Sequence, residues 1–338
     1  MNRSIQIYTY EEIPDLIRIK PEALNAYYTR EYFDYVKMQK EEPLYFCSEE
    51  YCLLVILKTK YLFNIAKIPA EYIKLNEDIG NAEEFMTSVI EILKKKYNVL
   101  WVGPSAPCAL FQETPLNAMK IPFGSYIINL EKSEEEIWAG IHSKHRNVIR
   151  KAEKENVVIK RGGKELIEEY MPIEKATWDR SSRTGNTPDF YQQMFDCMPS
   201  QMKIYLAYKD EQVQGGAIFF FHSSQCYYLY GASIDKPSSG AMNLLHWIAM
   251  KDMKEWGVKQ YNFVGCRIGV QSGSKLDGIQ RFKERFGGEL VQGYMFKVIC
   301  KPLLYWVYKK ILYIKKNRGR KYPIDIIEEE YSKWNEGN

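Results

Sequence analysis

The chain has 338 residues, a formal net charge of +4 and 46% hydrophobic residues. This length is typical of two globular domains, and the 27% charged and 14% aromatic residues exclude a disordered or collagen-like chain. Because the excess of positive charge is small, the overall charge does not indicate nucleic-acid binding, and any site for an anion must be local.

The compartment is predicted from the N-terminus, the apolar stretches and the cysteines. The first residues lack the apolar core of a signal peptide, and the most apolar stretch, residues 215–221, has the length of a strand rather than of a membrane span. The seven cysteines include no Cys-x-x-Cys pair, although Cys47 and Cys52 lie five residues apart across an expected turn. We therefore expect reduced thiols, no metal site and a cytoplasmic protein, either free or peripheral at the inner face of the membrane.

The first half of the chain predicts a lobe that begins with β-hairpins. Alternating apolar residues and turn residues indicate three strands, and a helix with one apolar face follows them. A strand, a short helix and a last strand complete the lobe. In order, these elements are residues 43–47, 51–58 and 61–68, helix 81–97, strand 99–103, helix 109–119 and strand 126–130.

The second half predicts the same order of elements. They are strands 203–208, 213–221 and 226–230, helix 241–256, strand 259–264, helix 275–286 and strand 289–299. Hairpins followed by helix, strand, helix and strand favour two similar α+β lobes, with mixed, mostly antiparallel sheets flanked by helices. We expect a first domain over residues 1–132 and a second over residues 133–300, with the tail, residues 301–338, packing on the first.

A basic helix is predicted at the start of the second lobe. Ser133 and the three glutamates after it have the form of a capping box, and apolar residues continue at helical spacing to Ala152. The opposite face carries the cations Lys144, Arg146, Arg150, Lys151 and Lys154. These charges suit phosphate groups, but glutamates interleave with them, so an ordinary solvated helix face explains them equally well.

Five motifs in the second half occur in a characteristic order. They are residues 143–157 (SKHRNVIRKAEKENV), Gly215-Gly216-Ala217, residues 228–233 (YLYGAS), residues 243–247 (NLLHW) and residues 278–290 (GIQRFKERFGGEL). Together they resemble the FemABX-type peptidyl and aminoacyl transferases over about residues 125–300. The resemblance implies two tandem GNAT-like domains, which have the acyl-CoA N-acyltransferase-like fold, and transfer of an acyl or aminoacyl group onto an amine.

Three functions remain open. The leading one is a FemABX-like aminoacyltransferase or acyltransferase that takes its donor from aminoacyl-tRNA and forms an amide on a cell-envelope, peptidoglycan-type precursor. The second is an acyl-CoA-dependent N-acyltransferase that acts on an amino sugar or small amine in polysaccharide biosynthesis. The third is a non-catalytic protein that binds RNA or anionic lipid with its basic surface. None of the three predicts a permanently bound cofactor.

Lys283 is the predicted cation of the transfer site. An amine that attacks an ester or thioester produces an oxyanion, which a cation or backbone amides must stabilise. Lys283 lies at the edge of the apolar stripe of its helix, where the pattern alone indicates a surface lysine, and the resemblance implies a place at the reaction centre. Tyr230 is the second predicted catalytic residue. Tyr228 and Phe282 are predicted to bind substrate, although tyrosine on a central strand is also ordinary core packing.

The resemblance also implies residues on the acceptor side. Lys37 stands where relatives contact nucleotide-sugar phosphates, and Tyr191 belongs to an aromatic pair near the acceptor. Thr187 occupies the position of an expected arginine, with Arg180 and Arg183 upstream, and this departure from the family pattern leaves open whether the acceptor is a UDP-linked or lipid-linked muropeptide at all. Asp277 and Glu284, near the last motif, and Glu174 are candidates for a general base, and a phosphate or ester of the substrate is the alternative proton acceptor.

The donor and the partners depend on two further segments. Acetyl-CoA transferases hold the CoA pyrophosphate with a glycine-rich turn before their main helix. Here that turn, residues 235–242, has one glycine, and Pro237 removes an amide donor, which favours aminoacyl-tRNA. The tail, residues 301–321, is basic and amphipathic, which suits an anionic membrane surface or the phosphates of tRNA. We expect its apolar side to pack on the first lobe and residues 315–321 to contact anions.

Overall fold

The chain forms two compact units in the computed structural model, which describes residues 4–13, 24–76, 80–105, 108–180, 185–317 and 325–336. Unit 1 consists of Met1–Lys20, Val36–Gly124 and Gln292–Asn338, and unit 2 consists of Pro21–Tyr35 and Ser125–Val291. The expected division after residue 132 thus lies a few residues beyond the start of the long segment of unit 2. Among the described helices, none is both long and apolar enough to cross a membrane.

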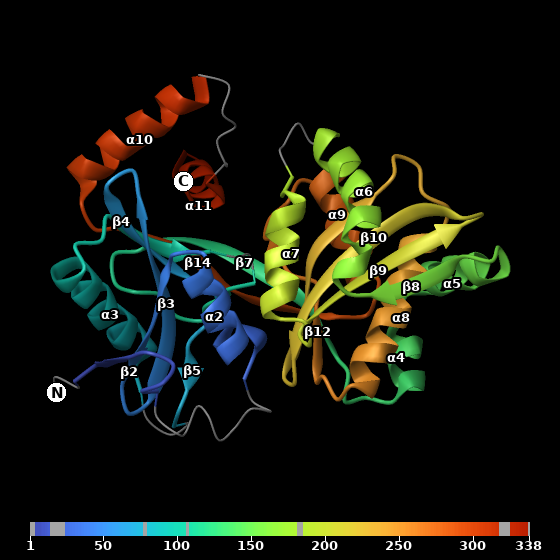
Figure 1. Cartoon of the computed structure of the whole chain (residues 1–338), viewed down its shortest axis with the longest axis horizontal. Coiled ribbons are helices and arrows are strands. Elements are labelled where there is room, and N and C mark those ends of the chain that lie inside the picture. The colour runs from blue at the N-terminus through green and yellow to red at the C-terminus, as the bar shows by residue number, and fades with distance from the viewer. Residues whose placement is uncertain are drawn as a thin grey trace. The chain divides into compact units, whose positions relative to one another are not determined.

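Unit 1 is built on a mixed sheet in which antiparallel hairpins precede a parallel strand (Figure 1). Its strands are β1 (Gln6–Tyr8), β2 (Glu42–Cys47), β3 (Tyr51–Lys60), β4 (Phe63–Ile68), β5 (Ile73–Lys74) and β6 (Trp101–Pro104). Strands β1 to β4 are antiparallel neighbours, β6 lies parallel to β4, and the end of β14 (Glu289–Ile299) lies antiparallel to β6.

Three helices cover the two faces of this sheet. Helix α3 (Ala82–Lys96) begins at Asn81, whose side chain accepts a hydrogen bond from the amide of Glu84, and its apolar stripe packs on the face formed by alternate residues of β3 such as Leu53 and Val55. On the opposite face, α10 (Pro302–Asn317) packs through Tyr305 and Tyr308. Helix α11 (Ile326–Glu336) follows in the same unit.

Unit 2 repeats this arrangement. Its strands are the end of β7 (Met119–Asn129), β8 (Val158–Gly162), β9 (Met202–Lys209), β10 (Gln212–His222), β11 (Gln225–Ser233) and β12 (Gln260–Asn262). Strands β8 to β11 are antiparallel, β12 lies parallel to β11, and Ile127–Asn129 of β7 pair with β12. The predicted α+β class with mixed, mostly antiparallel sheets is therefore confirmed.

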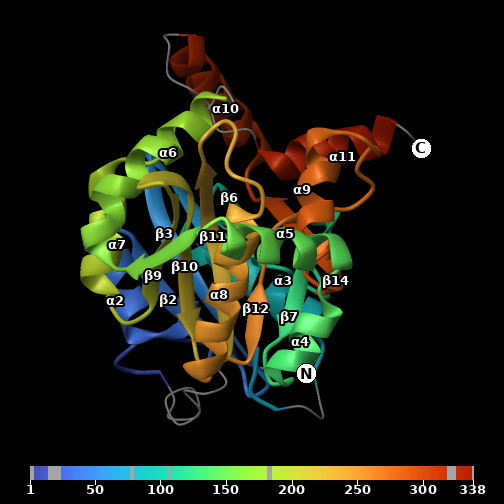
Figure 2. The same ribbon diagram turned by 90° about the vertical axis from the view of Figure 1, so that its right-hand side faces the viewer.

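Helices lie on both faces of the unit 2 sheet, as Figures 1 and 2 show. On one face are α4 (Glu134–Gly140), α5 (Ser143–Lys154) and α8 (Ala241–Glu255), which share a core cluster with alternate residues of β9, β10 and β12. On the other face are α6 (Ile167–Asp179) and α7 (Pro188–Cys197). A short turn, η2 (Ala26–Tyr28), places Tyr27 against Phe220 of β10, and α2 (Arg30–Met38) follows it.

The predicted basic helix is in fact two helices. The capping box of Ser133 and Glu136 is present, but α4 ends at Gly140, where Ile141 becomes extended, and α5 begins after His142. The amide of His142 donates to the carbonyl of Arg285 at 2.8 Å instead of continuing the helix. Glycine weakens a helix interior, and the long-range hydrogen bond favours the break.

The predicted short helix at residues 109–119 is wrong. Phe111 pairs its backbone with Tyr294, at 3.0 and 2.7 Å, and Asn117 adopts a left-handed conformation. Pro115 cannot donate a helical hydrogen bond, and β7 already begins at Met119.

The expectation that all cysteines are reduced is also wrong for one pair. Cys47 and Cys52 are joined by a disulfide. The register of the β2–β3 hairpin places them directly opposite each other, with Cα atoms 4.1 Å apart. The spacing across the expected turn was the signal for this contact, because hairpin pairing brings such residues together.

Candidate functional site

In unit 2 the parallel strands β11 and β12 pair over only three residues. The ladder joins Gln225–Tyr227 to Gln260–Asn262 and then ends, while β11 continues along β10 to Ser233. Ligands of sheets with parallel strands bind at the carboxyl ends of these strands, where neighbours part. The residues that follow β12 therefore occupy the position at which such sheets hold their ligands.

Val264 and Gly265, just after β12, both have left-handed backbone conformations, with φ of 51° and 66°. This conformation is rare for a β-branched residue. Asn262 supports it, because its side-chain oxygen accepts from the amide of Val264 at 2.8 Å and also from the hydroxyl of Ser125. Both turned carbonyls accept hydrogen bonds from Lys283 Nζ, and the bond to Gly265 measures 2.8 Å. Since an ammonium group has three N–H bonds, one remains for a ligand.

Lys283 is a buried cation whose hydrogen-bond partners are uncharged main-chain carbonyls. It lies on α9 (Lys275–Glu284) and is 8% exposed. Burial lowers its pKa to about 8, so it is mostly protonated at neutral pH and loses its proton in mildly alkaline solution. No carboxylate within the described ranges forms an ion pair with it. A desolvated ammonium group interacts far more strongly with a nearby negative oxygen than an exposed one does.

Neutral aromatic groups surround this lysine. His246 of α8 is fully buried, and its Nδ1 lies 2.7 Å from the hydroxyl of Tyr261. Burial, together with the charges of Lys283 and His145, lowers the pKa of His246 to about 3, so the ring carries no charge. The ring of Phe282 packs against both histidines, with centroids 5.6 and 5.2 Å apart. Phe282 is thus part of the wall beside Lys283.

Tyr228 and Tyr230 lie on opposite faces of the sheet. Residues two apart normally share a face, but the register between β10 and β11 shifts here and Leu229 becomes an extra residue. Tyr228 faces α8, with its ring centroid 4.6 Å from that of His246, and burial raises its pKa to about 12. Tyr230 faces α7, with its ring 5.3 Å from Tyr191. The structure therefore brings Tyr228, rather than Tyr230, to the ring of His246.

A buried carboxylate lies on the α7 face. Glu174 of α6 is 2% exposed, and its Oε1 accepts from Trp178 Nε1 at 3.1 Å and from the hydroxyl of Tyr191. Its Oε2 and the hydroxyl of Tyr170 have no hydrogen-bond partner in the part of the chain that the structure describes. Burial raises the pKa of Tyr191 far above its ordinary value, so this hydroxyl stays protonated and donates.

The sequence model of the FemAB family matches residues 113–214 and 207–313, together more than half of the chain. The chain belongs to the FemAB family. Its structure is similar to that of FemX, with a TM-score of 0.65, 12% identity, and coverage of 90% of this chain and 99% of FemX. No curated protein sequence matches it.

Two further solved structures are similar in fold. The C-terminal domain of a putative lysylphosphatidylglycerol synthetase from Agrobacterium fabrum has a TM-score of 0.51 and 12% identity, over 86% of this chain and 91% of that domain. L-PGS from Bacillus licheniformis has a TM-score of 0.50 and 11% identity, over 85% of this chain and 97% of that protein. At such identities the likeness shows the fold alone, and the tandem GNAT-like fold is confirmed.

In this FemAB-family chain the predicted basic residues of α5 have different environments. Arg146 donates to the carbonyls of Ala139 and Ile141 at 2.8 and 2.6 Å, so it caps the C-terminal end of α4. Arg150 lies over the ring of Trp138 at 5.4 Å. Lys144 is exposed at the start of α5. Of these three residues, Arg150 and Lys144 are available to contact phosphates, whereas the guanidinium group of Arg146 already donates to the carbonyls of α4.

The remaining predicted residues do not gather around Lys283. Lys37 lies exposed in the last turn of α2. Tyr191 is fully buried, with its hydroxyl bonded to Glu174. Asp277 accepts from the amide of Gly273 at 2.8 Å and pairs with Arg281, and Glu284 is exposed. Arg183 lies outside the described residues.

Proposed function

We propose that the protein is an aminoacyltransferase or acyltransferase that forms an amide on an amine of a cell-envelope precursor. The observation that carries this proposal is Lys283, a buried ammonium group anchored to two main-chain carbonyls, with one N–H left over. Family membership supports the reaction class. The peptidoglycan-type acceptor is the expectation that follows from the sequence motifs.

The proposed step is aminolysis of an ester. The neutral amine of the acceptor attacks the carbonyl carbon of the donor, a C–N bond forms, and the carbonyl oxygen becomes an oxyanion. Lys283 donates its remaining N–H to that oxygen. The attraction between the ammonium group and the oxyanion is stronger there than in water, because the surrounding aromatic groups are neutral and exclude solvent. The oxyanion then re-forms the carbonyl and expels the ribose oxygen of the donor. The proton lost by the amine nitrogen is balanced by the proton gained by the leaving oxygen.

The N-terminal end of α8 in unit 2 supports aminoacyl-tRNA, rather than acyl-CoA, as the donor. Gly240 caps α8 with φ of 83°, and a Cβ atom there would lie 2.0 Å from the carbonyl oxygen of Val148. The backbone of α5 therefore lies against the N-terminal end of α8, which is the place where acetyl-CoA transferases hold the pyrophosphate. Lys144 and Arg150 of α5 offer positive charges for the phosphates of tRNA.

Helix α10 supports a peripheral contact with an anionic membrane. Its inner side packs in unit 1, whereas Leu303, Trp306 and Tyr313 are 86%, 63% and 61% exposed on the outer side. Residues 301–321 contain several lysines and arginines and no acidic residue. Exposed aromatic and aliphatic side chains flanked by cations fit the interface of an anionic bilayer.

The test compares two lysine substitutions on one helix. Lys283→Met removes the cation from the reaction centre, and Lys275→Met removes an exposed cation from the first turn of α9. With charged tRNA and a cell-envelope precursor pool, we expect Lys283→Met to lower kcat by roughly 100- to 1000-fold. The Lys275→Met protein should retain normal turnover.

Equal turnover by Lys283→Met and wild type would remove Lys283 from the reaction. Saturable binding of acetyl-CoA in calorimetry, together with acylation of an amino sugar, would establish the CoA-dependent alternative instead. Tight RNA binding by a protein that transfers no acyl group would establish the non-catalytic one.

A further inference from the structure

His246 of α8 is a buried polar residue that the proposed transfer step does not use. It belongs to the NLLHW motif, residues 243–247, and its side chain is 0% exposed. Its Nδ1 lies 2.7 Å from the hydroxyl of Tyr261 on β12, but its Nε2 has no hydrogen-bond partner among the described residues. Native proteins rarely leave a buried nitrogen unpaired, because removing it from water is costly unless a new hydrogen bond forms.

The hydroxyl of Tyr261 indicates which nitrogen of the ring carries the proton. Tyr261 is also 0% exposed, and within the described ranges its hydroxyl bonds only to His246. If the hydroxyl donates to Nδ1, the proton of the ring is on Nε2, and one N–H is left unpaired. If Nδ1 donates instead, both the hydroxyl proton and the lone pair of Nε2 are left unpaired. The first arrangement leaves fewer buried groups without a partner, so Nε2 is a donor.

The ring of His246 lies close to the point at which β11 and β12 part. The ring of Tyr228 on β11 meets it edge-on, with centroids 4.6 Å apart, and the ring of Phe263, just beyond β12, lies 5.1 Å away. Phe282 of α9, the residue before Lys283, lies 5.6 Å away. The positive charge of Lys283 contributes to the lowered pKa of His246, which places the ammonium group and the imidazole close together.

Two donors from two helices therefore lack an acceptor in this part of unit 2. Lys283 keeps one N–H after bonding two carbonyls, and His246 keeps its Nε2–H. We infer that His246 Nε2 is a second donor to the acyl oxygen on which negative charge develops, so that the site pairs one charged donor with one neutral donor. This role rests on the proposed transfer reaction and adds a catalytic residue to it.

A neutral second donor suits a site that already holds a buried cation. An imidazolium ring would repel Lys283, whereas a neutral N–H adds a hydrogen bond without a second charge. The ester oxygen of the bound donor carries little charge, and both hydrogen bonds strengthen when the amine attacks and the oxygen becomes negative. The ring keeps its proton throughout. Because the pKa of His246 is about 3, the ring is also too weak a base to take the proton of the amine.

The protonation of the ring is tested first and without substrate. The chain has four histidines, so correlation spectra of protein with 15N-labelled histidine contain few signals, and His246→Gln identifies those of His246 by their loss. At neutral pH we expect the proton on Nε2 and an unprotonated Nδ1 that accepts a hydrogen bond. A proton on Nδ1 would overturn the donor role.

The kinetic test compares variants that differ in one N–H. Tyr261→Phe keeps the imidazole, and Tyr261→Phe/His246→Phe replaces it with a ring that has no nitrogen, without leaving a hydroxyl unpaired. With charged tRNA and a cell-envelope precursor pool, we expect the double variant to have a kcat roughly 100-fold below that of Tyr261→Phe, with little change in KM. His246→Gln keeps an N–H at the end of its side chain and should lose less than about tenfold.

The control is His222→Gln at the end of β10, where the ring bonds the carbonyl of Leu24, and it should retain normal turnover. If circular dichroism shows that the double variant does not fold, His246→Asn replaces it, because this shorter amide ends near the place of Nδ1 and cannot reach that of Nε2. We then expect a kcat at least about tenfold below that of His246→Gln.

The outcomes separate the role of His246 from the proposed function. Wild type that transfers no acyl group would overturn the proposed function and this role together. Active wild type, with equal kcat in Tyr261→Phe and the folded double variant, would overturn the role of His246 alone. Equal kcat in His246→Asn and His246→Gln would do the same.

Discussion

Each unit contains a buried lysine close to its parallel strand, and the two lysines have opposite surroundings. Lys297 in unit 1 is bonded to Asp325 and Glu328, with its ammonium group also 4.7 Å from the ring of Trp101. Lys283 in unit 2 is bonded to main-chain carbonyls and has no acidic partner within the described ranges. A paired buried lysine holds helices together, whereas an unpaired one retains a charge that a reacting group can use.

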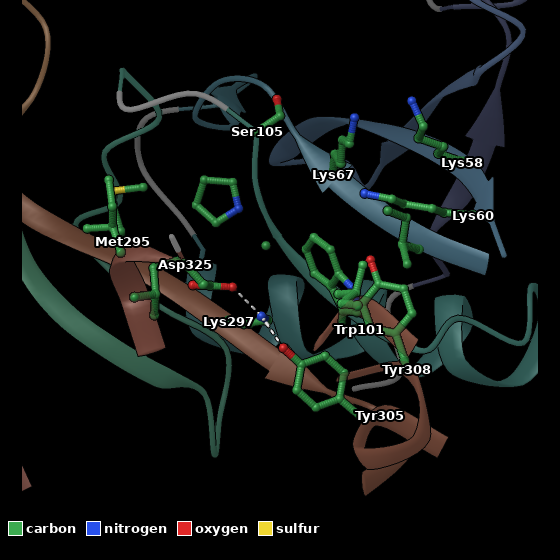
Figure 3. A pocket seen from close by; sticks show the side chains of 16 residues that line it. Lys58, Lys60, Lys67, Trp101, Ser105, Met295, Lys297, Tyr305, Tyr308 and Asp325 are labelled. Atoms are coloured by element: carbon green, nitrogen blue, oxygen red, sulfur yellow. Dashed lines mark hydrogen bonds and ion pairs between the residues drawn. The ribbon is translucent and has the colours of Figure 1, made fainter. Parts of the chain in front are cut away.

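The two units also differ in the backbone at the carboxyl end of the parallel strand, which is β12 in unit 2 and β6 in unit 1. In unit 2, Val264 and Gly265 both adopt left-handed conformations and turn their carbonyls toward Lys283. In unit 1, Gly103 and Pro104 continue as part of β6 and line an open cavity (Figure 3). The same topology thus supplies one strained, enclosed position and one relaxed, open position, which suit chemistry and recognition respectively.

Removing the paired lysine should give the largest change in stability. Lys297→Met leaves Asp325 and Glu328 partly buried with fewer cations, so we expect the free energy of unfolding in urea to fall by about 2–4 kcal/mol. Lys283→Met loses two hydrogen bonds but also removes an unpaired buried charge, and we expect a change below about 1.5 kcal/mol. Equal losses for both would show that the two lysines do not differ in this way. Lys333→Met, on the exposed side of α11, is the control.

The pH dependence of turnover sharpens the contrast further. Because burial lowers the pKa of Lys283 to about 8, the cation that we propose to be catalytic is present below that pH and is lost above it. We expect kcat to fall about tenfold per pH unit on the alkaline side. Lys283→Arg should remove this alkaline limb, since arginine keeps its charge.

The same lowered pKa affects the stability of the folded state in the opposite direction to its effect on kcat. The unfolded chain binds the proton of Lys283 more tightly, so between pH 8 and the ordinary lysine pKa stability should increase as pH rises.

For turnover, an alkaline decrease in kcat that persists in Lys283→Arg would assign the titration to another group, such as the attacking amine.

A smaller kinetic effect should follow from Gly231→Ala. A Cβ atom there would lie 1.6 Å from the hydroxyl of Tyr228, so the ring must move away from His246. We expect kcat to fall roughly tenfold while the fold persists. Gly278→Ala on α9 meets nothing within 4 Å, and it should stabilise the helix by about 0.5–1 kcal/mol without loss of turnover. Normal kinetics in Gly231→Ala would exclude Tyr228 from the site.

The smallest effect concerns the outer side of α10. Leu303→Asn combined with Trp306→Asn should reduce flotation with vesicles that contain phosphatidylglycerol by a few-fold, because apolar area at the interface is lost. Vesicles of phosphatidylcholine alone should bind neither protein. Undiminished flotation of the double variant would place any membrane contact elsewhere.

Local features of the fold could be predicted from the sequence. The hairpins, α3, α8 and the capping box of Ser133 all follow from periodicity and end signals within a few residues. The break at Gly140 depends on a hydrogen bond to Arg285, and the irregular segment near Phe111 depends on Tyr294. Such contacts between residues far apart in the chain leave no periodic signal.

The site was predictable only in part, for a similar reason. The apolar stripe of α9 places Lys283 beside the core, but its carbonyl partners come from Val264 and Gly265. Tyr228 and Tyr230 share a face in any regular strand, and only the register with β10 reveals the extra residue between them. The cavity of unit 1 is lined by β3, β4 and α10, and α10 begins only at Pro302. These segments lie far apart in the sequence, so no short stretch of it predicts the cavity.

Strands β7 and β14 limit how the polypeptide can be dissected. A fragment that starts at residue 133 lacks Ile127–Asn129, the strand that pairs with β12, and a fragment that stops at residue 132 lacks Val298 and Ile299, which pair with β6. The first truncation would expose the edge of β12 and the second the edge of β6, and an exposed strand edge invites aggregation. Neither half should be recoverable when expressed alone, whereas co-expression of both halves allows the missing strands to be supplied in trans.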